Sequence, residues 1–123
     1  MTSKRILVVD DNADAADAVA VLLETEGHEV RTAHSGRSAL REALRWAPDA
    51  MVLDIGLPDM DGYELAREIA ALALAPAPLL IALSGYGRPS DLQMARDAGF
   101  THHLLKPADP EALFALFREH VLG

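Results

Sequence analysis

The sequence has no cysteine, which excludes disulfides and thiolate metal sites. Lysine is nearly absent as well: Lys4 and Lys106 are the only two, and the arginines are spread along the chain. The formal net charge is −8, whereas proteins that grip nucleic acid present clustered lysine and arginine. These shortages argue against direct binding to nucleic acid.

Long apolar runs are also missing. No run approaches the roughly 20 residues that a membrane-spanning helix needs, and the first residues lack the pattern of a signal peptide. We therefore expect a cytoplasmic protein that does not enter a membrane. With 123 residues, of which 50% are hydrophobic and 24% charged, the chain fits one globular domain, and we expect residues 1–123 to form it.

Short apolar runs alternate with amphipathic stretches along the whole chain, which is typical of βα units around a parallel sheet. The pattern predicts strands at 5–9, 29–33, 50–53, 79–83 and 101–105. It predicts helices at 13–26, after Ser35, around 65–72, at 90–98 and at 110–121. Five strands and five helices favour a doubly wound α/β fold with helices on both faces of the sheet.

Helical periodicity also predicts which side chains are buried. The first helix is expected to bury Ala15, Val19, Leu22 and Leu23, and the second Ala39, Ala43, Leu44 and either Trp46 or Ala47. The strand at 29–33 is short and polar, so we expect it at an edge of the sheet.

Polar residues follow four of the predicted strands. Asp10 and Asp11 end the first strand, Asp54 the third, Ser84 the fourth and Lys106 the fifth. In such sheets the carboxyl ends of the strands carry the chemistry, so these side chains are expected to meet. Three crowded carboxylates repel one another and need a compensating cation, and oxygen-only ligands favour Mg²⁺. With a lysine beside them, they predict a pocket that accepts a phosphoryl group, with Asp54 as the nucleophile.

Each of these residues has an ordinary alternative interpretation. Asp11 and Asn12 could cap the following helix, Asp54 and Ser84 could be turn residues, and Lys106 could be a solvated surface lysine. The inference depends on four strand ends that together supply the groups one site needs.

Four motifs resemble the response regulator receiver domain of two-component signalling, in particular the chemotaxis-regulator type. They are Val8-Val9-Asp10-Asp11-Asn12, Leu53-Asp54 with Pro58 and Asp61-Gly62, Ala82-Leu83-Ser84-Gly85, and Leu105-Lys106-Pro107. Their order and spacing extend the resemblance over about residues 5–121. It implies a flavodoxin-like fold with strand order 2-1-3-4-5.

The resemblance also implies roles for individual residues. Asp54 would receive a phosphoryl group from the phosphohistidine of a sensor histidine kinase or histidine phosphotransfer protein. Mg²⁺ would be held by Asp11 and Asp54 directly, by Asp10 through water, and by the backbone carbonyl of Gly56.

Two further residues would contact the phosphoryl group after transfer, namely the hydroxyl of Ser84 and the ammonium of Lys106. The Lys106–Pro107 peptide bond is expected to be cis, as in the family.

Three positions are expected to affect switching and phosphate lifetime. The switch residue of the family, commonly Tyr or Phe, is His103 here, and we hypothesise that it moves inward when Ser84 engages the phosphoryl group. Gly56 and Tyr86 lie two residues beyond the acceptor and the hydroxyl, where the family sets the dephosphorylation rate. The face remodelled by phosphorylation would be the one formed by the fourth helix, fifth strand and fifth helix, and the domain would be a monomer or a phosphorylation-dependent dimer.

Other functions fit the sequence less well. A dehalogenase-like phosphatase needs a second aspartate where Gly56 stands, and a flavodoxin needs a phosphate loop after the first strand. A pseudo-receiver that binds partners without phosphorylation is the remaining alternative. We expect no turnover enzyme by itself, and either a stand-alone regulator or the receiver of a hybrid histidine kinase.

Overall fold

The computed structural model describes residues 3–85 and 87–121, so Tyr86 lies outside the described residues. Strands and helices alternate in the predicted order: β1 (Arg5–Val9), α1 (Ala13–Thr25), β2 (Glu29–Ala33), α2 (Gly36–Trp46), β3 (Ala50–Asp54), α3 (Gly62–Ala71), β4 (Leu79–Ser84), α4 (Pro89–Ala98), β5 (His102–Leu105) and α5 (Pro110–Val121). No helix in these ranges combines the length and hydropathy that spanning a membrane requires.

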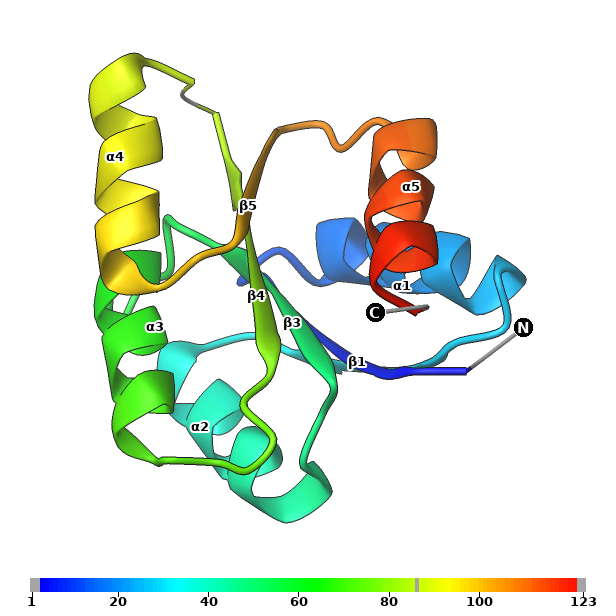
Figure 1. Cartoon of the computed structure of the whole chain (residues 1–123), viewed down its shortest axis with the longest axis horizontal. Coiled ribbons are helices and arrows are strands. Elements are labelled where there is room, and N and C mark those ends of the chain that lie inside the picture. Colours follow the sequence, from blue (N-terminus) through cyan, green and yellow to red (C-terminus); the bar gives the residue numbers. More distant parts are fainter. Residues whose placement is uncertain (1–2, 86, 122–123) are drawn as a thin grey trace.

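The five strands form one parallel sheet in the order β2-β1-β3-β4-β5. This confirms the predicted doubly wound, flavodoxin-like order. Figure 1 shows the sheet nearly edge-on, with α2, α3 and α4 on one side and α1 and α5 on the other. Because both faces are covered, the central strand β3 is buried at all five positions.

Alternate strand residues point to opposite faces and so build two cores. The strand residues in the core under α2, α3 and α4 are Leu7, Val9, Ala33, Met51, Leu53, Leu80 and Ala82. The core under α1 and α5 takes Ile6, Val8, Ala50, Val52, Ile81 and Leu83. Each fully buried large side chain contributes about 1.5–3 kcal/mol, so the two cores fix the strands relative to one another.

Local sequence sets the starts of three helices. The side chains of Asn12, Ser35 and Asp61 accept hydrogen bonds from amides three residues ahead, over 3.0, 3.1 and 2.7 Å. Because Asn12 caps α1, the carboxylate of Asp11 does not serve as the cap. Helix α4 ends at Gly99, whose φ of 108° is a left-handed conformation that favours glycine.

Two predicted helix faces are wrong in part. Helix α1 buries Ala16, Ala20 and Leu23. Of the four residues expected to be buried, only Leu23 is, because the buried face lies one residue further along the helix, and Val19 is only partly buried. The helix is apolar around much of its circumference, so the periodicity fitted both faces. In α2 the expected Leu44 is 60% exposed.

The buried stripe of α2 instead runs through Ala39, Ala43 and Trp46. Successive helix residues turn by about 100°, so Leu44 is carried out of the stripe that Ala43 occupies. Trp46 packs as expected: it is buried beneath the guanidinium of Arg31, whose carbon lies 4.6 Å from the ring centroid.

Candidate functional site

The register of the sheet brings the predicted strand ends to one edge. Asp54 in β3 lies opposite Leu83 in β4, and Ser84 lies opposite Leu105 in β5. The amide of Lys106 continues the ladder by donating to the carbonyl of Ser84 over 2.8 Å. Strands β1 and β3 are neighbours from which the chain winds in opposite directions, and such a switch point is where doubly wound folds carry their sites.

Three carboxylates cluster at this switch point. One ligand oxygen each from Asp10, Asp11 and Asp54 lies within 4.8 Å of the other two. Asp10 and Asp54 are 3% and 6% exposed, while Asp11 is open to solvent. Burying two carboxylates at such a short distance costs free energy unless cationic groups or hydrogen bonds compensate their charges.

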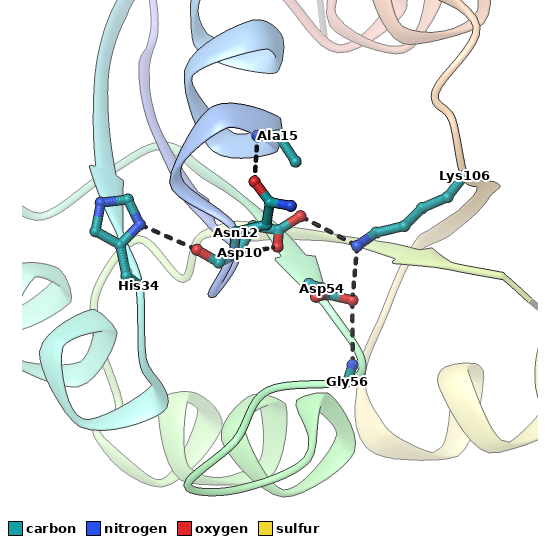
Figure 2. A network of polar contacts seen from close by, with 7 residues as sticks. All are labelled: Asp10, Asn12, Ala15, His34, Asp54, Gly56 and Lys106. Carbon is teal, nitrogen blue, oxygen red and sulfur yellow. Dashed lines mark hydrogen bonds and ion pairs between the residues drawn. The ribbon is translucent and has the colours of Figure 1, made fainter.

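Lys106 supplies part of that compensation. Its ammonium lies 3.1 Å from Asp10 Oδ2 and 3.1 Å from Asp54 Oδ1, and Figure 2 shows it between the two carboxylates. Burial works to lower the pKa of Lys106, but the hydrogen bonds to Asp10 and Asp54 outweigh it and raise the pKa above its ordinary value. The lysine therefore stays positively charged. Its peptide bond to Pro107 is cis, as expected, and so is Ala75–Pro76.

The two oxygens of Asp54 have different surroundings. Oδ1 accepts hydrogen bonds from the amide of Gly56 and from Lys106, each over 3.1 Å. Within the described residues Oδ2 accepts no hydrogen bond, and since no fully buried side-chain oxygen there lacks a partner, Oδ2 keeps some contact with solvent. Burial raises the pKa of Asp54, and the bonds from Gly56 and Lys106 only partly offset it.

The donor set fits a hard divalent cation. Three carboxylates and one ammonium leave the pocket with two net negative charges, which one divalent ion would neutralise. All the side-chain ligands are oxygens, the type that Mg²⁺ prefers. An acidic pocket that could bind a metal ion is therefore present at the predicted position.

Comparison with known proteins decides the family. Residues 6–118 match the response regulator receiver domain family. The chain belongs to this family. The receiver domain is a signalling module of two-component response regulators, and the observed five-stranded fold agrees with that assignment.

Individual relatives support the same assignment. An uncharacterized 14.6 kDa protein of Leptolyngbya boryana is 38% identical, with 96% of this chain and 90% of that protein covered. The transcriptional regulatory protein CreB of Escherichia coli is 32% identical over 96% of this chain, which spans only 51% of CreB. The chemotaxis response regulator CheY4 of Vibrio cholerae superimposes with a TM-score of 0.89 at 29% identity, covering 96% of this chain and 98% of CheY4.

The predicted switch residues of the receiver domain are in direct contact. The hydroxyl of Ser84 and Nε2 of His103 share a hydrogen bond of 2.9 Å. Ser84 is 6% exposed and His103 is half-buried, so the contact is sheltered by β4 and β5. The predicted site residues that the structure describes lie at one edge of the sheet or next to it, while their individual roles stay predictions.

Two residues near the site carry no signal in the sequence. His34, at the end of β2, contacts the backbone carbonyl of Asp10 through Nδ1 at 3.0 Å. Asp59 caps α2, a helix that begins more than twenty residues earlier in the chain, by accepting from the amides of Gly36 and Arg37. Both contacts depend on how distant segments pack, which local patterns do not reveal.

Proposed function

We propose that this receiver domain accepts a phosphoryl group on Asp54 from the phosphohistidine of a sensor histidine kinase or histidine phosphotransfer protein. The bond from phosphorus to the histidine nitrogen breaks as a bond from phosphorus to Asp54 oxygen forms. The histidine nitrogen leaves with the electron pair. The product is an aspartyl phosphate.

The observation that carries this proposal is the asymmetry of the Asp54 carboxylate. Lys106 and the Gly56 amide hold Oδ1 and so fix the orientation of the group. Oδ2 accepts no hydrogen bond among the described residues and is not fully buried, so it is the oxygen available for attack on phosphorus. A positioned nucleophile of this kind needs little rearrangement to reach the donor.

Charge neutralisation supports the same reaction. When bound, Mg²⁺ would neutralise phosphoryl oxygens during transfer. The proposed ligands are Asp11, Asp54 and the carbonyl of Gly56, with Asp10 acting through water. Lys106 lies 3.1 Å from Asp54 Oδ1 and would form an ion pair with the transferred phosphoryl group.

Phosphorylation would act on the Ser84–His103 contact. A phosphoryl group on Asp54 offers new acceptor oxygens to Ser84, which would then exchange its bond to His103 for one to the phosphoryl group. His103 would follow, and the face formed by α4, β5 and α5 would change shape. Met94 and Leu105 leave apolar area exposed on α4 and β5, which suits a partner or a second phosphorylated copy.

The setting of this domain is part of the proposal. We take residues 1–123 as one receiver domain of a cytoplasmic phosphorelay, without enzymatic turnover of its own. Both a stand-alone regulator and the receiver of a hybrid histidine kinase agree with its relatives, since the chain spans 90% of one and about half of another.

Intact-mass measurement tests the proposal directly. The chain is incubated with acetyl phosphate, with and without Mg²⁺, beside the Asp54→Asn variant. We expect the wild type to gain one phosphoryl group only with Mg²⁺, and the variant to gain none. Asp61→Asn, which alters a helix cap in the same loop, is the matched control and should be phosphorylated.

No mass gain in any condition would contradict the proposal. The alternative is a pseudo-receiver that acts through its unmodified surface. Phosphorylation that persists in Asp54→Asn would place the acceptor elsewhere and would equally reject the assignment.

A further inference from the structure

The loop after the phosphoacceptor is tied to a helix from another part of the chain. Asp59 accepts hydrogen bonds from the first amides of α2, from Gly36 to Oδ1 over 2.9 Å and from Arg37 to Oδ2 over 3.1 Å. These two bonds lower the pKa of Asp59, so its charge persists. The N-cap residue of α2 is Ser35, whose hydroxyl accepts a hydrogen bond from a different amide, that of Ser38. Asp59 therefore adds a charge-assisted link between the β3–α3 loop and α2.

Met60, the residue after Asp59, packs tightly against Gly36 at the start of α2. A Cβ atom on Gly36 would lie 2.4 Å from Cγ and 2.7 Å from Sδ of Met60. Only glycine permits this approach without a shift of Met60. The β3–α3 loop and the start of α2 are thus joined both by hydrogen bonds and by close packing.

The connection between β2 and α2 contacts the end of β1 on the other side of the site. His34 lies two residues before Gly36, and Figure 2 shows its imidazole directed at the backbone carbonyl of Asp10. A carbonyl oxygen only accepts, so Nδ1 of His34 carries the proton and donates over 3.0 Å. This bond anchors the residue whose carboxylate contacts Lys106.

These contacts form a closed circuit around the acidic pocket. One route from Asp10 to Asp54 passes through the ammonium of Lys106. The other passes from Asp10 through His34 to the start of α2, then through Asp59 and the loop back to Gly56, whose amide donates to Asp54. The second route holds together two carboxylate-bearing segments whose charges repel.

We propose that His34 and Asp59 are positioning residues that brace the metal- and phosphoryl-binding pocket from the start of α2. This inference rests on the proposed function, because it assigns the two side chains to the same site. Neither side chain contacts Asp54 or Lys106 in the described contacts. Each instead fixes a segment that carries proposed Mg²⁺ ligands, the β1 end in one case and the β3–α3 loop in the other.

Mg²⁺ titration calorimetry on the full chain tests the brace. We expect Asp59→Ala to weaken Mg²⁺ binding about tenfold, the lower end of what losing an outer-shell partner costs. The matched control is Ser35→Ala, which removes a cap from the same helix end but no link to the loop. It should lower thermal stability while leaving the Mg²⁺ dissociation constant near that of the wild type.

A metal-free measurement separates positioning from general loosening. In amide nuclear magnetic resonance spectra without Mg²⁺, Asp59→Ala should shift the Gly56 signal, and Ser35→Ala should not. At the other end, His34→Asn retains an N–H donor near the place of Nδ1 and should bind Mg²⁺ much like the wild type, whereas His34→Ala should bind it more weakly.

Equal effects of Asp59→Ala and Ser35→Ala on Mg²⁺ affinity would overturn the brace, and so would an unmoved Gly56 amide in Asp59→Ala. Failure of the proposed function is distinguishable. A chain that takes no phosphoryl group but loses Mg²⁺ affinity in Asp59→Ala keeps the brace and rejects phosphorylation. If the wild type binds no Mg²⁺, the Gly56 amide shift alone decides the brace.

Discussion

His28 illustrates how a single buried side chain ties stability to pH. Its Nδ1 accepts a hydrogen bond from the amide of Lys4 over 3.1 Å, and its ring lies 5.5 Å from that of Phe117 in α5. Burial lowers the pKa of His28 below 6.5, with the charge of Glu26 acting in the opposite direction. The folded state therefore favours the neutral ring.

We expect the free energy of unfolding to fall as the pH drops below about 6.5, because the unfolded state then binds a proton that folded His28 resists. Above that pH the ring is neutral in both states, and the contribution is fully present. Urea unfolding at pH 7.5 and 5.5 measures the difference, and His28→Asn should reduce it. An equal acid loss in this variant would show that other groups cause it.

The neighbouring strands β4 and β5 join the site to helix α4. Ser84 ends β4 beside the acidic pocket, and His103 lies in β5, which packs next to α4. Their hydrogen bond links the acidic pocket to β5 and, through β5, to α4. If Ser84 changes its hydrogen-bond partner, the resulting movement of His103 in β5 can therefore reach the adjacent helix α4 directly.

We expect phosphorylation to shift amide signals along β5 and α4, and Ser84→Ala to remove most of this shift while Asp54 still accepts the phosphoryl group. Heteronuclear spectra of acetyl-phosphate-treated samples give the comparison, with intact mass confirming modification. The control is Ser90→Ala, an exposed hydroxyl at the start of α4. Full shifts in phosphorylated Ser84→Ala would exclude Ser84 as the link.

At the scale of the whole molecule, the fold gathers negative charge at one edge of the sheet. Three carboxylates meet a single ammonium there, within a chain whose formal net charge is −8. A divalent cation that binds the folded chain stabilises it by mass action, since the unfolded chain cannot gather the three carboxylates.

We expect Mg²⁺ at ten times its dissociation constant to stabilise the fold by about 1.4 kcal/mol, which corresponds to a rise of a few degrees in melting temperature. Asp11→Asn should abolish the rise without lowering the metal-free melting temperature, because Asp11 is exposed. Differential scanning calorimetry with MgCl₂, against NaCl of equal ionic strength, measures both. An equal rise in the variant would place the cation elsewhere.

The architecture and the residues of the candidate site follow from patterns in the amino-acid sequence. Continuous apolar runs predict strands that are covered on both faces of a parallel sheet. Parallel strands bring their carboxyl ends to one edge, so the sequence alone predicts that Asp10, Asp54, Ser84 and Lys106 lie together. Caps such as Ser35 and Asp61 are also local features of the sequence, because a cap bonds amides within the first turn of its own helix.

The remaining contacts depend on tertiary packing. The burial of Ala16 in place of Ala15 and the exposure of Leu44 depend on how each helix rotates against the sheet. The contacts of His34 with Asp10 and of Asp59 with α2 join residues more than twenty positions apart. Periodicity and capping describe interactions within a few residues, whereas these contacts exist because packing brings separate elements together.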